Sequence, residues 1–195
     1  MAVDRHASRG RPPVDSDRIL RAACRVFSKR GFFQSTLEDV RAEAGIGKGT
    51  IYRHFRNKEQ LLTAVLLHTA DALQRRIDPS LRGDQPIDTN LRWLAREILS
   101  FFSERPELFR IFVREGALSI PAVRQAMGAV VRQTHARTAA LLGGKHRRHA
   151  AEVFNHMVFG VLRQKIGFMD EPIHPDREAA FLVDIFLNGI RKARP

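Results

Sequence analysis

The chain has 195 residues, 44% of them hydrophobic, and a formal net charge of +12 at pH 7. This hydrophobic content allows one large domain or two small ones with a substantial core, and it excludes global disorder. The positive excess favours a polyanionic partner, either nucleic acid or an anionic membrane surface, and it is densest in residues 1–60, which hold 13 Lys and Arg against 7 Asp and Glu.

The single cysteine, Cys24, excludes an intrachain disulfide, which fits a reducing cytoplasm. Its apolar neighbours favour a buried, inert thiol over a redox sensor. The first residues lack the apolar stretch of a signal peptide, and no apolar run reaches the roughly 18 residues of a membrane span. We therefore expect a cytoplasmic protein.

Helix signals dominate the N-terminal third, and strand signals are nearly absent. Paired prolines make residues 1–14 a flexible basic arm. Four helices are then expected: one from Asp15 or Ser16 to Gly31, one from a capping box of Ser35 and Glu38 to about Ala44, one over about 48–55, and one from Asn57 to about Ile77.

The rest of the chain, after a polar segment over 79–87, carries similar helix start and stop signals. Prolines open helices and glycines close them. The expected helices cover about 88–103, a stretch from Pro106, a stretch from Pro121 to Gly143-Gly144, about 148–168, and about 176–192 after Pro175. We predict an all-α fold of about nine helices, with an N-terminal three-helix domain over 15–58 and a C-terminal helical domain over 59–195.

Residues 45–50 read GIGKGT, which raises the question of a phosphate-binding loop. A nucleotide-binding P-loop requires Gly, four residues, and then Gly-Lys followed by Ser or Thr, after a buried strand. Here Gly49 follows Lys48, Ala42 occupies the position of the first glycine, and the preceding segment LEDVRAEA has the period of a helix. The sequence therefore argues against a nucleotide site.

The same residues fit a helix-turn-helix motif, in which the second helix enters the major groove. Gly45 supplies the turn, and Gly49 removes a side chain where the helix would approach DNA. The inner face carries Val40, Ile46 and Ile51, with Phe55 one turn after Ile51; the outer face carries Lys48, Thr50, Tyr52, Arg53 and His54. Taken singly, the basic residues could form a solvated face and Tyr52 could belong to the core. Together with the basic arm, they indicate DNA binding.

At this point the chain resembles the tetracycline-repressor (TetR) family of bacterial transcription regulators. The resemblance covers residues 16–62 and is carried by RILRAACRVFSKRGFFQSTLEDV followed by AGIGKGTIYRHFRNKEQLL. It implies a helical homodimer whose N-terminal helices bind a palindromic operator, while the remaining helices bind a ligand and dimerise. The implied function is that of a repressor released by a small hydrophobic or aromatic effector.

The resemblance also implies DNA contacts for individual residues. Thr36 would touch a phosphate, as would Tyr52, His54 and Lys58. The residues facing the bases would be Lys48, Gly49, Thr50 and Arg53. Arg53 is the expected determinant of sequence choice, since an arginine paired with guanine contributes about 1–3 kcal/mol of discrimination.

Three features of residues 1–58, called the head from here on, leave alternatives open. Arg9 and Arg11, in the arm SRGRPP, form either a minor-groove hook or part of a solubilising tail. Arg41 stands where the family usually has alanine, so either its stem extends outward or the two helices lie further apart. Gly47 replaces the usual serine cap, at a cost of tenths of a kcal/mol.

Residues 59–195, called the body from here on, are rich in phenylalanine, for which core packing is the ordinary explanation. An apolar effector pocket with a few polar groups is the functional one. The candidates for lining it are Trp93, Phe102, Phe109, Arg110, Phe112, Arg114, His135, Asn155, His156 and Phe159. No cofactor is expected. His146 and His149 lack a third metal ligand, and no catalytic motif is present, so a helical enzyme and a constitutive, ligand-free DNA binder are the weaker alternatives.

The last two helices have strongly apolar faces. In the TetR family these helices form a four-helix dimer interface. The resemblance therefore implies an interface of Val153, Met157, Gly160, Val161, Phe181, Leu182, Ile185 and Phe186. Two reading helices related by a two-fold axis would then address a palindrome.

Overall fold

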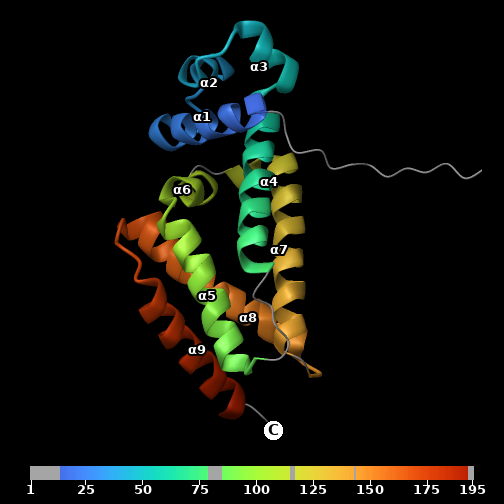
Figure 1. The fold of residues 1–195 in the computed structure, drawn as a ribbon, viewed down its shortest axis with the longest axis vertical. Helices are drawn as coiled ribbons and strands as arrows, with labels where there is room; N and C mark the ends of the chain where they lie inside the picture. Colours follow the sequence, from blue (N-terminus) through green and yellow to red (C-terminus); the bar gives the residue numbers. More distant parts are fainter. Residues whose placement is uncertain (1–13, 79–84, 115–116, 143, 193–195) are drawn as a thin grey trace, which may run out of the picture.

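The computed structural model describes residues 14–78, 85–114, 117–142 and 144–192 (Figure 1). These residues form helices and no strand, which confirms the predicted all-α class. The elements are α1 (Val14–Arg30), α2 (Leu37–Ala44), α3 (Lys48–His54), α4 (Lys58–Ile77), α5 (Ile87–Ser103), α6 (Pro106–Arg114), a 3-10 turn η2 (Ala117–Ser119), α7 (Pro121–Leu142), α8 (Arg147–Leu162), a π-helical segment η3 (Arg163–Met169) and α9 (Pro175–Lys192).

Most of the expected boundaries are confirmed by local chemistry. The Asn57 side chain caps α4 by accepting the backbone N–H of Gln60 at 2.8 Å. Gly45 ends α2 in the left-handed conformation, with φ of 61°. Both devices satisfy backbone groups that a helix end leaves without partners.

The predicted capping box of α2 is wrong by one residue. Thr36 is the N-cap: its hydroxyl accepts the backbone N–H of Asp39 at 3.1 Å, while the Asp39 carboxylate accepts the backbone N–H of Thr36 at 2.9 Å. Ser35 is buried, and its hydroxyl donates to the Gly31 carbonyl at 2.5 Å. Because that hydroxyl completes the turn after α1, it is not available to cap α2.

The helix expected over about 148–168 also differs. The α-helical pattern ends at Leu162, and residues 163–169 continue with π-type hydrogen bonding until Asp170 adopts a left-handed conformation with φ of 56°. Such wide turns accommodate an extra residue in a helix. Here the segment carries Phe168 and Met169 onto the surface.

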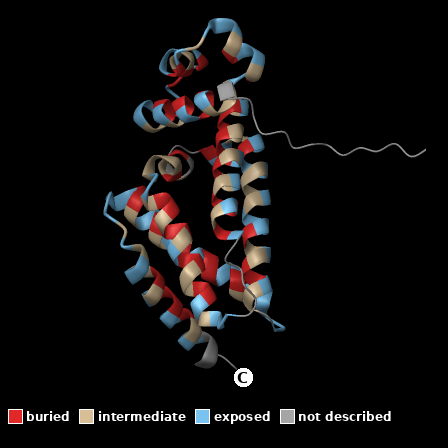
Figure 2. Cartoon of the chain, in the orientation of Figure 1, coloured by how far each residue is buried: buried red, intermediate tan, exposed pale blue. Residues whose placement is uncertain are grey.

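The buried side chains form two clusters joined by α4 (Figure 2). The first cluster unites α1 to α4 and also includes Ile111, Ala117 and Val123. The second joins the end of α4 to α5, α6, α8 and α9. The expected domain boundary after residue 58 therefore falls within the first turn of a helix that both cores share.

Candidate DNA-binding surface and an adjoining cavity

The inner face of α3 is fixed by apolar packing. Ile51 and Val40 are fully buried in the first cluster, Phe55 is buried beside them, and Ile46 packs against it from the turn. Burial of Ile51 and Phe55 one turn apart sets the rotation of α3 about its axis. The opposite face is therefore turned away from the protein.

That opposite face carries the expected DNA-reading residues. Lys48, Gly49 and Arg53 are exposed, Thr50 is half-buried, and 48% of Tyr52 is accessible. Tyr52 is thus not a core residue, which removes one alternative explanation. A Cβ atom built on Gly49 would meet nothing within 4 Å, so the protein itself gives no reason for a glycine at this position.

Arg41 lies along the turn between α2 and α3. Its Nη1 donates to the Ile46 carbonyl at 2.9 Å, and its Nε donates to the Glu38 carboxylate at 2.6 Å. The side chain therefore follows the turn, and 30% of it is exposed. Gly47 is the N-cap of α3 and makes no side-chain capping bond.

Three other residues with implied phosphate contacts already make hydrogen bonds within the protein. The Thr36 hydroxyl caps α2. His54 Nδ1 lies 3.4 Å from the Ser16 hydroxyl. Lys58 Nζ donates to the backbone carbonyls of Phe32 at 2.8 Å and Phe33 at 3.1 Å. These contacts position the ends of α2, α3 and α4, while DNA contacts by the same residues stay predictions.

Three arginines of α1 attach it to α2 and the following turn. Arg25 pairs with Glu43 at 2.6 Å, and Arg30 pairs with Asp39 at 2.5 Å. Arg18 Nη2 reaches the Gly45 carbonyl at 3.4 Å. The Thr36 hydrogen bonds and Arg30 hold the pKa of Asp39 below its usual value, and the hydrogen bond from Arg25 does the same for Glu43. Exposed pairs contribute little individually, but together they fix α1 against the helix-turn-helix.

The expected minor-groove arm lies outside the described residues, so Arg9 and Arg11 stay predictions.

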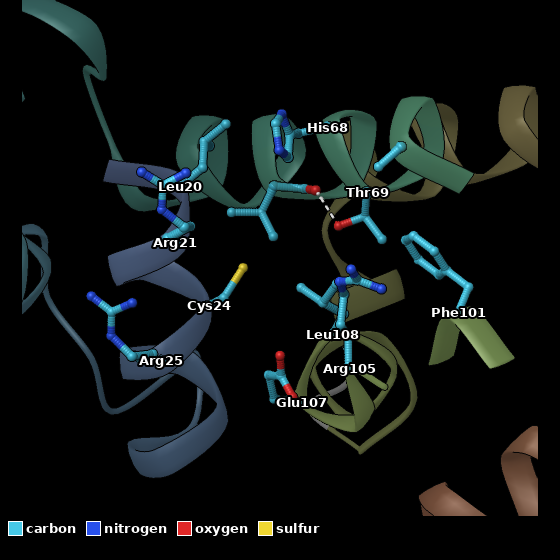
Figure 3. A pocket seen from close by; sticks show the side chains of 12 residues that line it. Leu20, Arg21, Cys24, Arg25, His68, Thr69, Phe101, Arg105, Glu107 and Leu108 are labelled. Carbon is cyan, nitrogen blue, oxygen red and sulfur yellow. Dashed lines mark hydrogen bonds between the residues drawn. The ribbon is translucent and has the colours of Figure 1, made fainter. Parts of the chain in front are cut away.

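A cavity of about 440 Å³ lies directly below this head, where α1 meets the body (Figure 3). Its walls come from α1, α4, the end of α5 and the start of α6. The lining residues are Leu20, Arg21, Cys24, Arg25, Val65, His68, Thr69, Ala72, Phe101, Arg105, Glu107 and Leu108. None of the ten residues expected to line an effector pocket is among them.

The thiol of Cys24 points into this cavity (Figure 3). Burial raises its pKa to about 12, and the nearby Glu107 carboxylate adds to the effect. A thiol with such a pKa is almost fully protonated at neutral pH and is a poor nucleophile. The geometry agrees with the inert thiol inferred from the sequence.

The phenylalanines expected in the pocket pack against one another. The Phe102 ring meets the Phe109 ring edge-on at 5.2 Å and the Phe159 ring at 6.3 Å. Phe102 and Phe109 are buried in the second cluster, and Trp93 packs against it. Arg110 is paired with Asp170. The side chains of Phe112 and Arg114 lie outside the described part of the chain.

The polar pocket candidates other than the two arginines of α6 lie on α7 and α8. Asn155 is fully buried and donates from Nδ2 to the Thr138 hydroxyl at 3.0 Å and to the Ala151 carbonyl at 2.7 Å. The rings of His135 and His156 meet edge-on at 5.8 Å, and burial lowers the pKa of His135. Asn155 thus makes its hydrogen bonds within the core, whereas His135 of α7 and His156 of α8 form a separate pair.

The apolar residues expected at a dimer interface divide into two groups. Phe181, Ile185 and Val153 are exposed, by 62%, 49% and 41%. Leu182 and Phe186 are buried in the second cluster, 6% and 4% exposed, so the structure places them in the protomer core. Sequence periodicity alone did not separate the inner from the outer half of this wide apolar face. Met157 and Val161 are partly buried, and Gly160 is exposed.

Two further expectations concern other kinds of site. No helix in the described ranges is long and apolar enough to cross a membrane. Within those ranges, no three side chains of His, Cys, Asp and Glu come together as they would around a metal ion. His149 instead lies 3.6 Å from Glu152 on the next turn.

Comparison with known proteins finds a family match within the head and the first turns of α4. Residues 19–65 match the family described as "Bacterial regulatory proteins, tetR family". YhgD of Bacillus subtilis, named as an uncharacterised HTH-type transcriptional regulator, is 28% identical over 109 residues, which are 56% of this chain and 57% of YhgD. The HTH-type transcriptional repressor Rv3405c of Mycobacterium tuberculosis is 34% identical over 84 residues, 42% of this chain and 45% of the repressor. The chain thus spans about half the length of these relatives.

Solved structures extend the likeness of fold to nearly the whole chain. The fatty acid degradation regulator FadR from Bacillus halodurans superposes with a TM-score of 0.81 at 17% identity, over 93% of this chain and 99% of that one. FadR from Bacillus subtilis, solved in complex with stearoyl-CoA, gives a TM-score of 0.76 at 19% identity, over 89% and 98%.

Proposed function

We propose that this chain, which belongs to the TetR family of bacterial regulatory proteins, binds duplex DNA by inserting α3 into the major groove and thereby regulates transcription. The observation that carries the proposal is the outer face of α3. Its cationic and hydrogen-bonding side chains are exposed around Gly49, a residue beside which the protein leaves open space. Phosphate contacts would orient the helix, and Arg53 would read base edges.

A homodimer is the second part of the proposal. One helix of seven residues reads only a few base pairs, so a palindrome read by two copies supplies the specificity. The exposed apolar side chains of Val153, Phe181 and Ile185 support α8 and α9 as the surface where the copies meet, because apolar groups of this size favour burial.

Repression relieved by a small apolar effector is the third part. One relative is named as a repressor, and one structural neighbour was solved with stearoyl-CoA. An effector need only favour the conformation that does not bind the operator. Its differential affinity for the two conformations then sets how strongly it releases DNA.

The test of DNA reading uses a palindromic site from the DNA flanking the gene and a scrambled duplex, both titrated by fluorescence anisotropy at equal salt. Arg53→Ala should weaken binding to the palindrome by about 1–3 kcal/mol and reduce the preference over the scramble. Arg132→Ala removes an exposed charge from α7 and should leave binding unchanged. Equal affinities for the two duplexes would instead identify a constitutive, non-specific binder.

A further inference from the structure

We infer that the cavity between α1, α4 and α6 is a binding site for an organic anion with an apolar body, such as a monocarboxylate of medium chain length. The cavity lies at the joint between the head and the body and adjoins the second cluster at Phe101. Its volume of about 440 Å³ falls within the range of small-molecule sites, roughly 300–1,000 Å³.

The charged groups around the cavity are predominantly cationic. Arg21, Arg25 and Arg105 line it together with one carboxylate, that of Glu107. Arg25 is paired with Glu43, and Arg105 is paired with Glu104 at 2.9 Å. Arg21 makes no ion pair or hydrogen bond to any other described side chain, so its guanidinium is available to an incoming anion. A guanidinium binds a carboxylate through two parallel hydrogen bonds.

The remaining wall is largely apolar. Leu20 and Val65 are buried, Ala72 and Leu108 are partly buried, and the Phe101 ring lies with the Arg105 guanidinium 5.1 Å from its centroid. Figure 3 shows the Thr69 hydroxyl turned toward the Val65 carbonyl, to which it donates at 2.8 Å, so this hydroxyl is not presented to a ligand. An aliphatic or aromatic body would therefore meet mostly carbon atoms, with its acid group beside Arg21 on the α1 side (Figure 3).

The position of the cavity connects it to α3, the helix proposed to enter the major groove. One wall is α1, which is tied to α2 and the turn by Arg18, Arg25 and Arg30. The facing wall is the start of α6, which belongs to the body (Figure 1). An occupant that alters the spacing of α1 and α6 moves α3 with α1. This coupling rests on the proposed DNA-binding function, whereas the binding of the anion does not.

The experiment titrates the full chain with octanoate by calorimetry, with octanamide as its uncharged analogue and sulfate as an anion without an apolar body. Octanoate should bind. Octanamide should bind at least about tenfold more weakly because it lacks the charge that strengthens hydrogen bonds from a guanidinium. Sulfate should also bind at least about tenfold more weakly because it has no apolar body to bury. Arg21→Gln should weaken octanoate at least about tenfold. Lys29→Gln, which removes a charge from the same helix outside the cavity, should leave it unchanged.

A second variant should change octanoate affinity in the opposite direction. Glu107→Gln removes the one carboxylate that opposes an anion, so it should strengthen octanoate binding. Equal octanoate affinity in wild type and Arg21→Gln would place the ligand elsewhere and overturn the assignment, as would the absence of octanoate binding or equal binding of sulfate. Operator affinity without octanoate is measured for each variant, so a failure of DNA binding is scored separately from a failure of the anion site.

Discussion

Replacement of Arg41 by alanine tests how the two helices of the DNA-binding motif are held together. The change introduces the residue that the TetR resemblance implies at this position, but it removes the hydrogen bonds to the Ile46 carbonyl and to the Glu38 carboxylate. If Arg41 forced α2 and α3 apart, alanine would stabilise the head. If the bonds in this structure hold the turn, alanine will destabilise it.

The magnitude follows from exposure. A hydrogen bond from a charged donor contributes about 1.5–3 kcal/mol when buried, but the Arg41 side chain is 30% exposed, so the lower end applies. The pair with Glu38 joins neighbours three residues apart and adds about 0.3 kcal/mol. The better helix propensity of alanine offsets a few tenths. The net loss is about 1.5 kcal/mol, or roughly 3–6 °C in Tm for a chain of this size.

The assay is urea and thermal unfolding followed by circular dichroism. Arg41→Met keeps the apolar stem and loses the same hydrogen bonds, so it should match alanine to within about 0.5 kcal/mol. Arg75→Ala removes an exposed ion pair on α4 and should change stability by no more than about 0.5 kcal/mol. An Arg41→Ala protein as stable as wild type, or more stable, would refute the assignment of the bond to the Ile46 carbonyl.

Three further outcomes are expected. Gly45→Ala should destabilise the chain by about 1–2 kcal/mol in urea unfolding, since φ is +61° and the added Cβ would lie 2.9 Å from an arginine nitrogen, whereas Gly189→Ala on α9 should stabilise slightly. Phe181→Asp should shift the sedimentation coefficient toward the monomer without unfolding, while Phe168→Asp, equally exposed on η3, should not. Cys24 should resist iodoacetamide at pH 8 in the native state and react in urea; because its folded pKa is raised, the stability linked to it is present below about 9 and falls as pH rises toward 12, which alkaline unfolding curves measure.

The helix boundaries were largely readable from the sequence because their chemistry is local. A cap such as Asn57 or a left-handed glycine such as Gly45 acts within three or four residues of itself. The one-residue error at α2 has a tertiary cause. Ser35 and Thr36 are both favourable caps in isolation, and the burial of Ser35 beside the Gly31 carbonyl decides between them.

The cavity was beyond the reach of that reasoning. It combines residues of α1, α4, α5 and α6 that lie up to 88 positions apart, and no spacing rule relates them. The apolar stripe of α9 posed the same difficulty. Its period identified a wide apolar face, but only the packing of α5 and α8 shows that Leu182 and Phe186 point inward while Phe181 and Ile185 remain outside.

The first core also bears on how a signal would pass between the two parts. Ile111, Ala117 and Val123 come from the body, yet they are fully buried among the side chains of α1 to α4. The head therefore completes its core with residues of α6, η2 and α7, and a shift of those elements changes the packing under α1 directly. Well-packed cores respond to such shifts by moving between discrete arrangements and do not deform smoothly. A ligand at this joint would thus act on the orientation of α3 through contacts that already stabilise the fold.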